Sequence, residues 1–354
     1  MRWLVAGAAL GAACGATEVA STPPPPTPDA GVARVDCRTR TSTRPRVEAV
    51  VDRQVLGTVL DLVDSAERCV DVVQFELIAS GSVRDARSAL IRAHDRGVQV
   101  RLLLDDEVTA NASTVNTLRR RGLNVRQGEG TIRTHVKLVV ADGGMLLGST
   151  NFSGSSFDSN HETNLLIRDP AVVEVFRSYA AALWEDQDHR PTPVPAGDWT
   201  DMQPWLDGGY SSVVLPRVEA ATTRIDALVY AVNLSPRFPD GPVAKVAASL
   251  QAAAARGVAV RVIFEISDYN EPLNELNRAA AEMFRAQGVE VRFDPVSTIS
   301  HAKLLMIDDA AAVGTNNWGY RGLVVDHEAG VLTTNSEVVA DLSSYFEQRW
   351  AEAR

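Results

Sequence analysis

The chain has 354 residues, of which 45% are hydrophobic and 23% are charged, which is enough for two globular domains with real cores. Three cysteines are too few for a disulfide-stapled miniprotein, and the composition excludes collagen-like and low-complexity chains. The formal net charge of −10 disfavours a protein that coats nucleic acid or anionic lipid through its overall field, although a local basic pocket remains compatible with it.

Residues 1–14 have the pattern of an export signal. A single cation precedes an uncharged apolar run, 3–13, that is too short to span a bilayer and ends in small residues. The junction at 12–15, Ala-Ala-Cys-Gly, resembles a bacterial lipoprotein cleavage site, although Gly11 stands where that pattern prefers Leu. We therefore predict export and a lipid anchor at Cys14, in the periplasm or on the outer membrane; secretion and a plain hydrophobic N-terminus are the alternatives.

Residues 15–44 have the composition of a tether. The stretch 21–29 is dominated by prolines and cannot pack a core, so we expect a disordered, extended spacer here. Because an oxidising compartment permits disulfides, Cys37 and Cys69 are candidates for a pair; two separate buried thiols are the alternative.

From about residue 45 the sequence alternates apolar runs of strand length with amphipathic stretches of helix length, which is the pattern of an α/β protein. An Ala- and Arg-rich helix is expected at 83–96, because its apolar residues have helical spacing and Gly97 follows as a helix stop. The clearest strands of the first half are expected at 70–75, 98–104, 136–140 and 145–148.

The second half repeats the first. A strand at 225–230, an Ala-rich helix at 243–256 closed by Gly257, and a strand at 258–264 follow each other in the same order. Repetition at this long period predicts two similar domains and excludes a solenoid, whose repeats are shorter. The expected organisation is a signal at 1–14, a tether at 15–44, a first domain at 45–187, a linker at 188–208 and a second domain at 209–354.

Polar residues occupy one fixed register in both halves. Each member of the second set lies 166 residues after its counterpart. The pairs are His135 and His301, Lys137 and Lys303, Asp142 and Asp308, Ser149 and Thr315, Asn151 and Asn317, and Glu162 and Glu328. Structural constraint repeats core residues but has little reason to keep this polar set together twice. His and Lys at i and i+2 of a strand also share one face, where burial without partners is costly.

Two complete copies of His-x-Lys-x4-Asp, each followed by Gly-Ser/Thr-x-Asn, resemble the paired signature motifs of the phospholipase D superfamily. The resemblance covers roughly residues 45–352. It implies two similar α/β/α domains with mixed sheets, related by a pseudo-twofold axis, whose motifs meet at one active site at the domain interface. It also implies phosphodiester hydrolysis or transfer by a phosphoric diester hydrolase.

The residue types fit this chemistry on their own terms. Attack on a phosphodiester needs a nucleophile, a proton donor for the leaving alkoxide and cations for the non-bridging oxygens. An imidazole can be neutral in one copy and protonated in the other at one pH, so two histidines can share these tasks through a phosphohistidine intermediate. No metal or other cofactor is then required. The residues alone leave open which histidine attacks; the resemblance implies the N-terminal copy, so we predict His135 as the nucleophile and His301 as the acid.

The other repeated residues are expected to support the two histidines. Lys137 and Lys303 belong with them to the catalytic set, as do Asp142 and Asp308, which end strands beside turns and are expected to act as structural supports. The resemblance implies that the glutamates orient the imidazoles. The predicted phosphate-binding and orienting residues are Ser149, Asn151, Thr315, Asn317, Glu162 and Glu328.

Two substrate classes compete for this site. A lipid-tethered phospholipase or phosphatidyltransferase is the first hypothesis, with phospholipid as substrate and the membrane reached through the N-terminal anchor. A periplasmic or extracellular nuclease is the alternative, and the acidic overall charge weighs modestly against it. A binding protein that has lost turnover is a third. Because both motifs lie in one chain, we expect a monomer.

Overall fold

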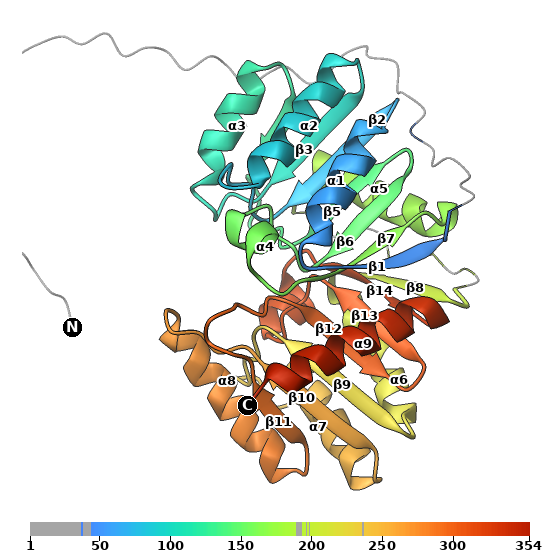
Figure 1. The fold of residues 1–354 in the computed structure, drawn as a ribbon, viewed down its shortest axis with the longest axis vertical. Helices are drawn as coiled ribbons and strands as arrows, with labels where there is room; N and C mark the ends of the chain where they lie inside the picture. The colour runs from blue at the N-terminus through green and yellow to red at the C-terminus, as the bar shows by residue number, and fades with distance from the viewer. Residues whose placement is uncertain (1–36, 38–43, 189–192, 196, 198, 236) are drawn as a thin grey trace, which may run out of the picture. The chain divides into compact units, whose positions relative to one another are not determined.

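Each half of the chain builds one seven-stranded mixed sheet with helices on it (Figure 1). The computed structural model describes residues 37, 44–188, 193–195, 197, 199–235 and 237–354. The two α/β halves confirm the expected fold class. The expected strands and helices are present, with ends that differ by one or two residues.

The first half runs from β1 to α5. Its elements are β1 (Val47–Val51), α1 (Gln54–Asp64), β2 (Cys69–Gln74), α2 (Val83–Asp95), β3 (Gln99–Leu104), α3 (Asn111–Arg120), β4 (Asn124–Gln127), β5 (Lys137–Ala141), β6 (Gly144–Gly148), α4 (Gly154–Asp158), β7 (Thr163–Ile167) and α5 (Pro170–Glu185).

The second half runs from β8 to α9. Its elements are β8 (Met202–Leu206), η1 (Asp207–Gly209), α6 (Tyr210–Ala220), β9 (Arg224–Val229), α7 (Pro242–Ala255), β10 (Ala259–Phe264), α8 (Glu271–Ala286), β11 (Glu290–Phe293), β12 (Lys303–Ile307), β13 (Ala310–Gly314), η2 (Arg321–Val325), β14 (Ala329–Thr333) and α9 (Ser336–Glu352).

The strand order is the same in both sheets. The first sheet is ordered β1-β7-β6-β5-β2-β3-β4, and the second is its counterpart, β8-β14-β13-β12-β9-β10-β11. In each sheet the last three strands are parallel, and the first of them pairs antiparallel with the strand that begins at the motif lysine. The start of β5 or β12 therefore lies beside the carboxyl end of β2 or β9.

Local sequence explains where the helices stop and start. Gly97 and Gly257 follow α2 and α7 with φ of 88° and 90°, a left-handed conformation that a side chain would strain. Asp169 begins α5 by accepting hydrogen bonds from the backbone N–H groups of Ala171 and Val172, and Pro170 occupies the first turn, where no partner is needed for its nitrogen. These signals lie in the sequence itself, which is why the expected helices were placed correctly.

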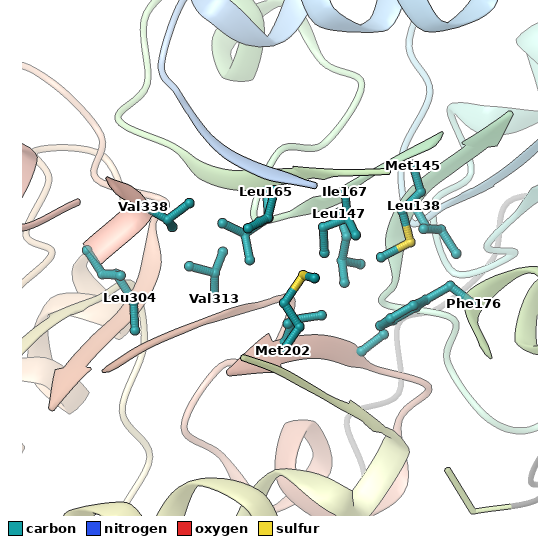
Figure 2. Packing of buried hydrophobic residues seen from close by; sticks show 14 of the residues in the cluster. Leu138, Met145, Leu147, Leu165, Ile167, Phe176, Met202, Leu304, Val313 and Val338 are labelled. Atoms are coloured by element: carbon teal, nitrogen blue, oxygen red, sulfur yellow. The ribbon is translucent and has the colours of Figure 1, made fainter. Parts of the chain in front are cut away.

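One apolar cluster joins the two halves. Helices α1, α2 and α3 cover the outer face of the first sheet, and α6, α7 and α8 cover that of the second. The inner faces share a single core with α5 and α9. Figure 2 shows Leu147 and Phe176 of the first half in this core with Met202, Leu304 and Val338 of the second. The halves are therefore held together by core packing and form one compact unit.

The structure moves one expected domain boundary. The segment 188–208 was expected to be a linker, but it contains β8, which pairs antiparallel with β14 at the edge of the second sheet. The second half therefore begins at Met202 or earlier and not at residue 209. Pro204 disguises this strand in the sequence, because proline is tolerated only in edge strands such as this one.

The structure tests one of the predictions for the N-terminal region. Cys37 and Cys69 form a disulfide, with their Cα atoms 5.5 Å apart, which selects the first of the two alternatives for these thiols. The expected signal at 1–14, Cys14 and nearly all of the tether at 15–44 lie outside the described residues. Within the described ranges, none of the helices has the length and apolar character that a bilayer span requires.

Candidate active site

The two motif histidines meet at the contact between the halves. His135 lies just before β5. The residue before it, Thr134, forms a parallel bridge with His327, and the His135 N–H donates to the His327 carbonyl over 3.0 Å. His301 lies just before β12 in the same arrangement: Ser300 forms a parallel bridge with His161, and the His301 N–H donates to the His161 carbonyl over 2.9 Å. Each motif is therefore hydrogen-bonded to the other half, which brings both imidazoles to one place.

The glutamates that hold these imidazoles are exchanged between the halves. Glu328 of the second half contacts His135 of the first, with 2.8 Å between Oε1 and Nδ1. Glu162 of the first half contacts His301 of the second, with 3.2 Å between Oε2 and Nδ1. Both carboxylates are fully buried. Because Nδ1 faces a carboxylate in each case, Nε2 is the nitrogen left to face a substrate.

Two predicted phosphate ligands have a different partner. The Ser149 hydroxyl donates to Glu162, and the Thr315 hydroxyl donates to Glu328. A hydroxyl has one proton to donate, so neither group can also donate to a phosphate oxygen while these bonds exist. In this arrangement Ser149 and Thr315 fix the carboxylates that face the imidazoles, and their role as phosphate ligands stays a prediction.

The two lysines lie beside the histidines that precede them. Lys137 Nζ donates to the His135 carbonyl over 2.6 Å, and Lys303 Nζ donates to the His301 carbonyl over the same distance. Phe75 and Tyr230 lie under the ammonium groups, with Nζ 5.1 and 4.9 Å from the ring centroids. Burial lowers the pKa of Lys137 to about 8 and that of Lys303 to about 7, against the opposing charge of the buried glutamates.

Asn151 and Asn317 are the remaining predicted phosphate ligands. Each buries an amide oxygen that has no hydrogen-bond partner among the residues that the structure describes. The two ends of a carboxamide have nearly the same shape, so either end can turn toward a ligand. Asn317 lines a cavity together with Lys303 and Tyr230. This unmet hydrogen-bonding capacity is what a bound phosphate would use.

The two imidazoles differ in their electrostatic surroundings. Burial, followed by the charges of Lys137 and Lys303, lowers the pKa of His135 well below its usual range. Burial and Lys303 also lower the pKa of His301, but Glu162 opposes them. The glutamates differ in the same sense. Burial raises the pKa of Glu328 to about 8, whereas His301 and Lys303 overcome burial and lower the pKa of Glu162. The pKa of His135 is therefore lowered more strongly than that of His301, and His301 lies beside the glutamate whose pKa is lowered.

The motif aspartates lie at the far ends of their strands. Asp142 follows the last residue of β5, about 16 Å along the strand from Lys137 at 3.3 Å per residue. It accepts from the N–H of Glu67, before β2. Asp308 accepts from the N–H groups of Thr222, Thr223 and Arg224, before β9. Both aspartates therefore tie down loops remote from the imidazoles, which agrees with the structural role expected of them within the motif.

A second layer of polar residues, not predicted from the sequence, lies behind the glutamates. Asp52, directly after β1, accepts from the Glu162 N–H over 2.9 Å and from the hydroxyl of Tyr345, on α9 of the other half, over 2.7 Å. Its second oxygen lies 3.2 Å from Nδ1 of His161. With φ of 50°, Asp52 holds a backbone conformation that side chains rarely adopt.

The same layer is present behind Glu328. Asp207, with φ of 49°, accepts from the hydroxyl of Tyr179, on α5 of the first half, over 2.6 Å. It also contacts the Glu328 N–H at 3.4 Å and His327 Nδ1 at 3.1 Å. Tyr179 and Tyr345 stand 166 residues apart, in the register of the motifs. This shared register is the sequence signal for their role, but it does not distinguish them from tyrosines that only pack in the core.

Comparison with known proteins agrees with this geometry. The family described as "Cardiolipin synthase, PLD-like domain" matches residues 59–184 and 214–350, one copy in each half. The chain belongs to this PLD-like family. This match confirms the resemblance drawn from the motifs.

Two curated relatives show how far the sequence likeness of this PLD-like protein extends. The mitochondrial cardiolipin hydrolase of Chlamydomonas reinhardtii is 29% identical over 132 residues, covering 37% of this chain and 57% of that one. The probable cardiolipin synthase YwiE of Bacillus subtilis is 23% identical over 315 residues, covering 82% of this chain and 57% of that one. The chain thus spans somewhat over half the length of these relatives.

A solved structure shares the complete fold. The phosphatidylserine synthase of Haemophilus influenzae superposes with a TM-score of 0.71 and 13% identity, covering 87% of each chain. At this identity the likeness establishes the two-half architecture of the PLD-like protein and leaves its substrate open.

Proposed function

We propose that this protein hydrolyses or transfers phosphatidyl groups through a phosphohistidine intermediate on His135, with His301 as the proton donor. The observation that carries the proposal is the exchange of glutamates, which holds two imidazoles at one site with Nε2 of each turned from its carboxylate. Hydrolysis of a diester through a covalent intermediate needs two such groups, one to attack phosphorus and one to protonate the leaving oxygen.

The electrostatic difference between the imidazoles supports the assignment of roles. A nucleophile must have its lone pair free, and His135 has the more strongly lowered pKa. A proton donor must carry a proton, and the ionised Glu162 favours the protonated form of His301. An anionic diester in the site favours that form further. Lys137 and Lys303 would neutralise the non-bridging oxygens, and the Asn151 and Asn317 amides would bind them.

The proposed reaction has two steps. In the first, a bond forms between His135 Nε2 and phosphorus while the bond from phosphorus to the leaving oxygen breaks, and that oxygen takes the proton of His301. In the second, water or an acceptor alcohol gives a proton to His301 as its oxygen attacks phosphorus, and the phosphorus–nitrogen bond breaks. Both histidines return to their starting states.

Phospholipid is the favoured substrate class, because the two relatives found by sequence are enzymes named for cardiolipin. Export, the lipid anchor at Cys14 and a monomeric state remain proposals. The disulfide supports export, since such bonds persist in oxidising compartments. Labelling with radioactive palmitate in a bacterial host tests the anchor: label should enter the protein and be lost in Cys14→Ser.

The function is tested by incubating the purified protein with phosphatidylcholine and, separately, with single-stranded DNA, both in chelator. Choline release, with a phosphatidyl adduct detected by intact mass in the wild type and absent in His135→Ala, is the expected result. Degradation of DNA without choline release would replace this proposal with the nuclease alternative. Loss of turnover on adding chelator would contradict the metal-independent mechanism.

A further inference from the structure

A second, apolar cavity lies in the second half. It has a volume of about 220 Å³ and lies between the loop after β9, the start of α7, α8 and the segment after Asn317. Its apolar lining residues include Leu234, Phe238, Pro242, Ala244, Met283 and Tyr320. Nothing in the mechanism above uses this cavity.

Two short backbone segments place the cavity near the active site. Tyr320 stands three residues after Asn317, which bounds the separation of their Cα atoms at about 10 Å. Asn233, which also lines the cavity, donates its N–H to the Trp318 carbonyl over 2.7 Å. Three residues before Asn233, Tyr230 packs on His301 with ring centroids 4.7 Å apart. A ligand whose phosphate lies between the histidines could therefore extend into the cavity.

The first half has no counterpart of this lining within its described residues. Twelve residues join β9 to α7, whereas eight join β2 to α2, so the second half has four additional residues in this loop. Phe238 of the longer loop stacks on Tyr320, with ring centroids 3.9 Å apart. In the first half the position of Tyr320 is taken by Gly154, which packs against Ser80. The two halves therefore differ at this position: small and polar residues lie there in the first half and aromatic residues in the second.

The exposed apolar surface follows the same division. The large hydrophobic side chains that are exposed in the described part of the chain are Tyr269, Leu276 and Val296, all in the second half. Tyr269 lies in the loop after β10, at the same edge of the sheet as the start of β12, which follows His301. In the register of 166 residues, Leu276 and Val296 correspond to Ala110 and Gly130 of the first half. The apolar cavity and the exposed apolar side chains therefore both belong to the second half.

We propose that the cavity at Leu234, Phe238 and Tyr320 binds the first part of an acyl chain of the substrate, so that the second half forms the lipid-facing side of the active site. A phosphatidyl ester is apolar on one side of phosphorus and polar on the other, and this asymmetry matches that of the protein. A nucleic acid strand carries similar groups on both sides of each phosphate and would not need it. This inference rests on the proposed function and specifies how the lipid lies.

The test uses a series of short-chain phosphatidylcholines that remain monomeric in solution, so that KM reports binding of single molecules. Each methylene buried in the cavity contributes about 0.8 kcal/mol, or about a fourfold decrease in KM. Ala244→Phe fills the cavity from α7, and Leu234→Ser removes part of its lining. Ile78→Ser, in the equivalent loop of the first half, is the matched control. Hydrolysis of bis(p-nitrophenyl) phosphate, which has no acyl chain, reports the integrity of the catalytic groups.

In the wild type and in Ile78→Ser, KM should decrease about fourfold for each methylene until the cavity is full. In Ala244→Phe and Leu234→Ser this dependence should flatten, with hydrolysis of bis(p-nitrophenyl) phosphate retained. A wild-type KM that is independent of chain length, or a dependence unchanged by both cavity variants, would overturn the inference while leaving the proposed function intact. Failure of the wild type to cleave any diester would instead overturn the proposed function.

Discussion

Substitution of Tyr179 and Tyr345 tests which histidine is the nucleophile and which is the proton donor. Tyr345 supports Asp52 and, through it, Glu162 and His301; Tyr179 supports the equivalent chain that leads to His135. Tyr→Phe at either position removes one hydroxyl and leaves the ring in place. We therefore predict that Tyr345→Phe impairs proton donation to the leaving group, whereas Tyr179→Phe impairs nucleophilic attack.

The size of the effect follows from the bond that is lost. The Tyr345 hydroxyl donates over 2.7 Å to Asp52 Oδ1. Burial alone would raise the pKa of Asp52, but its bonds to His161, Glu162 and Tyr345 lower it, so the acceptor is ionised at neutral pH. A hydrogen bond to a charged group is worth about 1.5–3 kcal/mol. If all of this were lost at the imidazole, the rate would decrease by about 10- to 100-fold, which sets the upper limit for each variant.

The assay compares two leaving groups. p-Nitrophenolate leaves without much help from an acid, whereas choline, an alkoxide leaving group, needs a proton. We expect Tyr345→Phe to lower kcat for choline release several-fold more than kcat for p-nitrophenol release, and Tyr179→Phe to lower both equally. Equal losses on both substrates in both variants would refute the assignment of His135 and His301. Unchanged kcat in both variants would refute the positioning role of the tyrosines.

Three further predictions concern pH and stability. Because the lysine pKa values are lowered, to about 7 for Lys303 and about 8 for Lys137, the ammonium charges are lost as pH rises through this range. We expect kcat/KM to fall above about pH 8, and a constant kcat/KM up to pH 9.5 would contradict this. Phe176→Ala should cost about 3–5 kcal/mol in urea unfolding and leave a single transition, since this buried ring lies in the core shared by both halves; two separate transitions would argue against a shared core. Reduction of the Cys37–Cys69 bond, which closes a span of 32 residues, should lower the free energy of unfolding by about 3–4 kcal/mol, and an unchanged midpoint with and without reductant would show that the bond is not formed.

Much of the fold was predictable because the sequence states it twice. Apolar runs mark the strands, and Gly97 and Gly257 mark the ends of two helices. The expected elements therefore agree with the observed ones within one or two residues. Repetition of His, Lys, Asn and Glu in one register identified the chemistry. Both kinds of signal depend on residues near each other in the chain, where sequence is most informative.

What escaped prediction depends on contacts between distant residues. The register pairs Glu162 with Glu328, but it does not say that each serves the histidine of the other half, because that follows from the packing of the two sheets. The orientation of the Ser149 and Thr315 hydroxyls likewise depends on which acceptor the fold brings near. The edge strand β8 was read as a linker because its proline masks the pattern of a strand.

The exchange of glutamates constrains how this chain can change over evolutionary time. Each imidazole–carboxylate dyad is bipartite, with its base encoded in one repeat and its support in the other. The two repeats therefore cannot change independently at these positions, since a change of the glutamate in one repeat affects the histidine of the other. Because the repeats are covalently joined, their assembly does not depend on protein concentration. The loops of each repeat can then differ while the two histidine–glutamate pairs are kept.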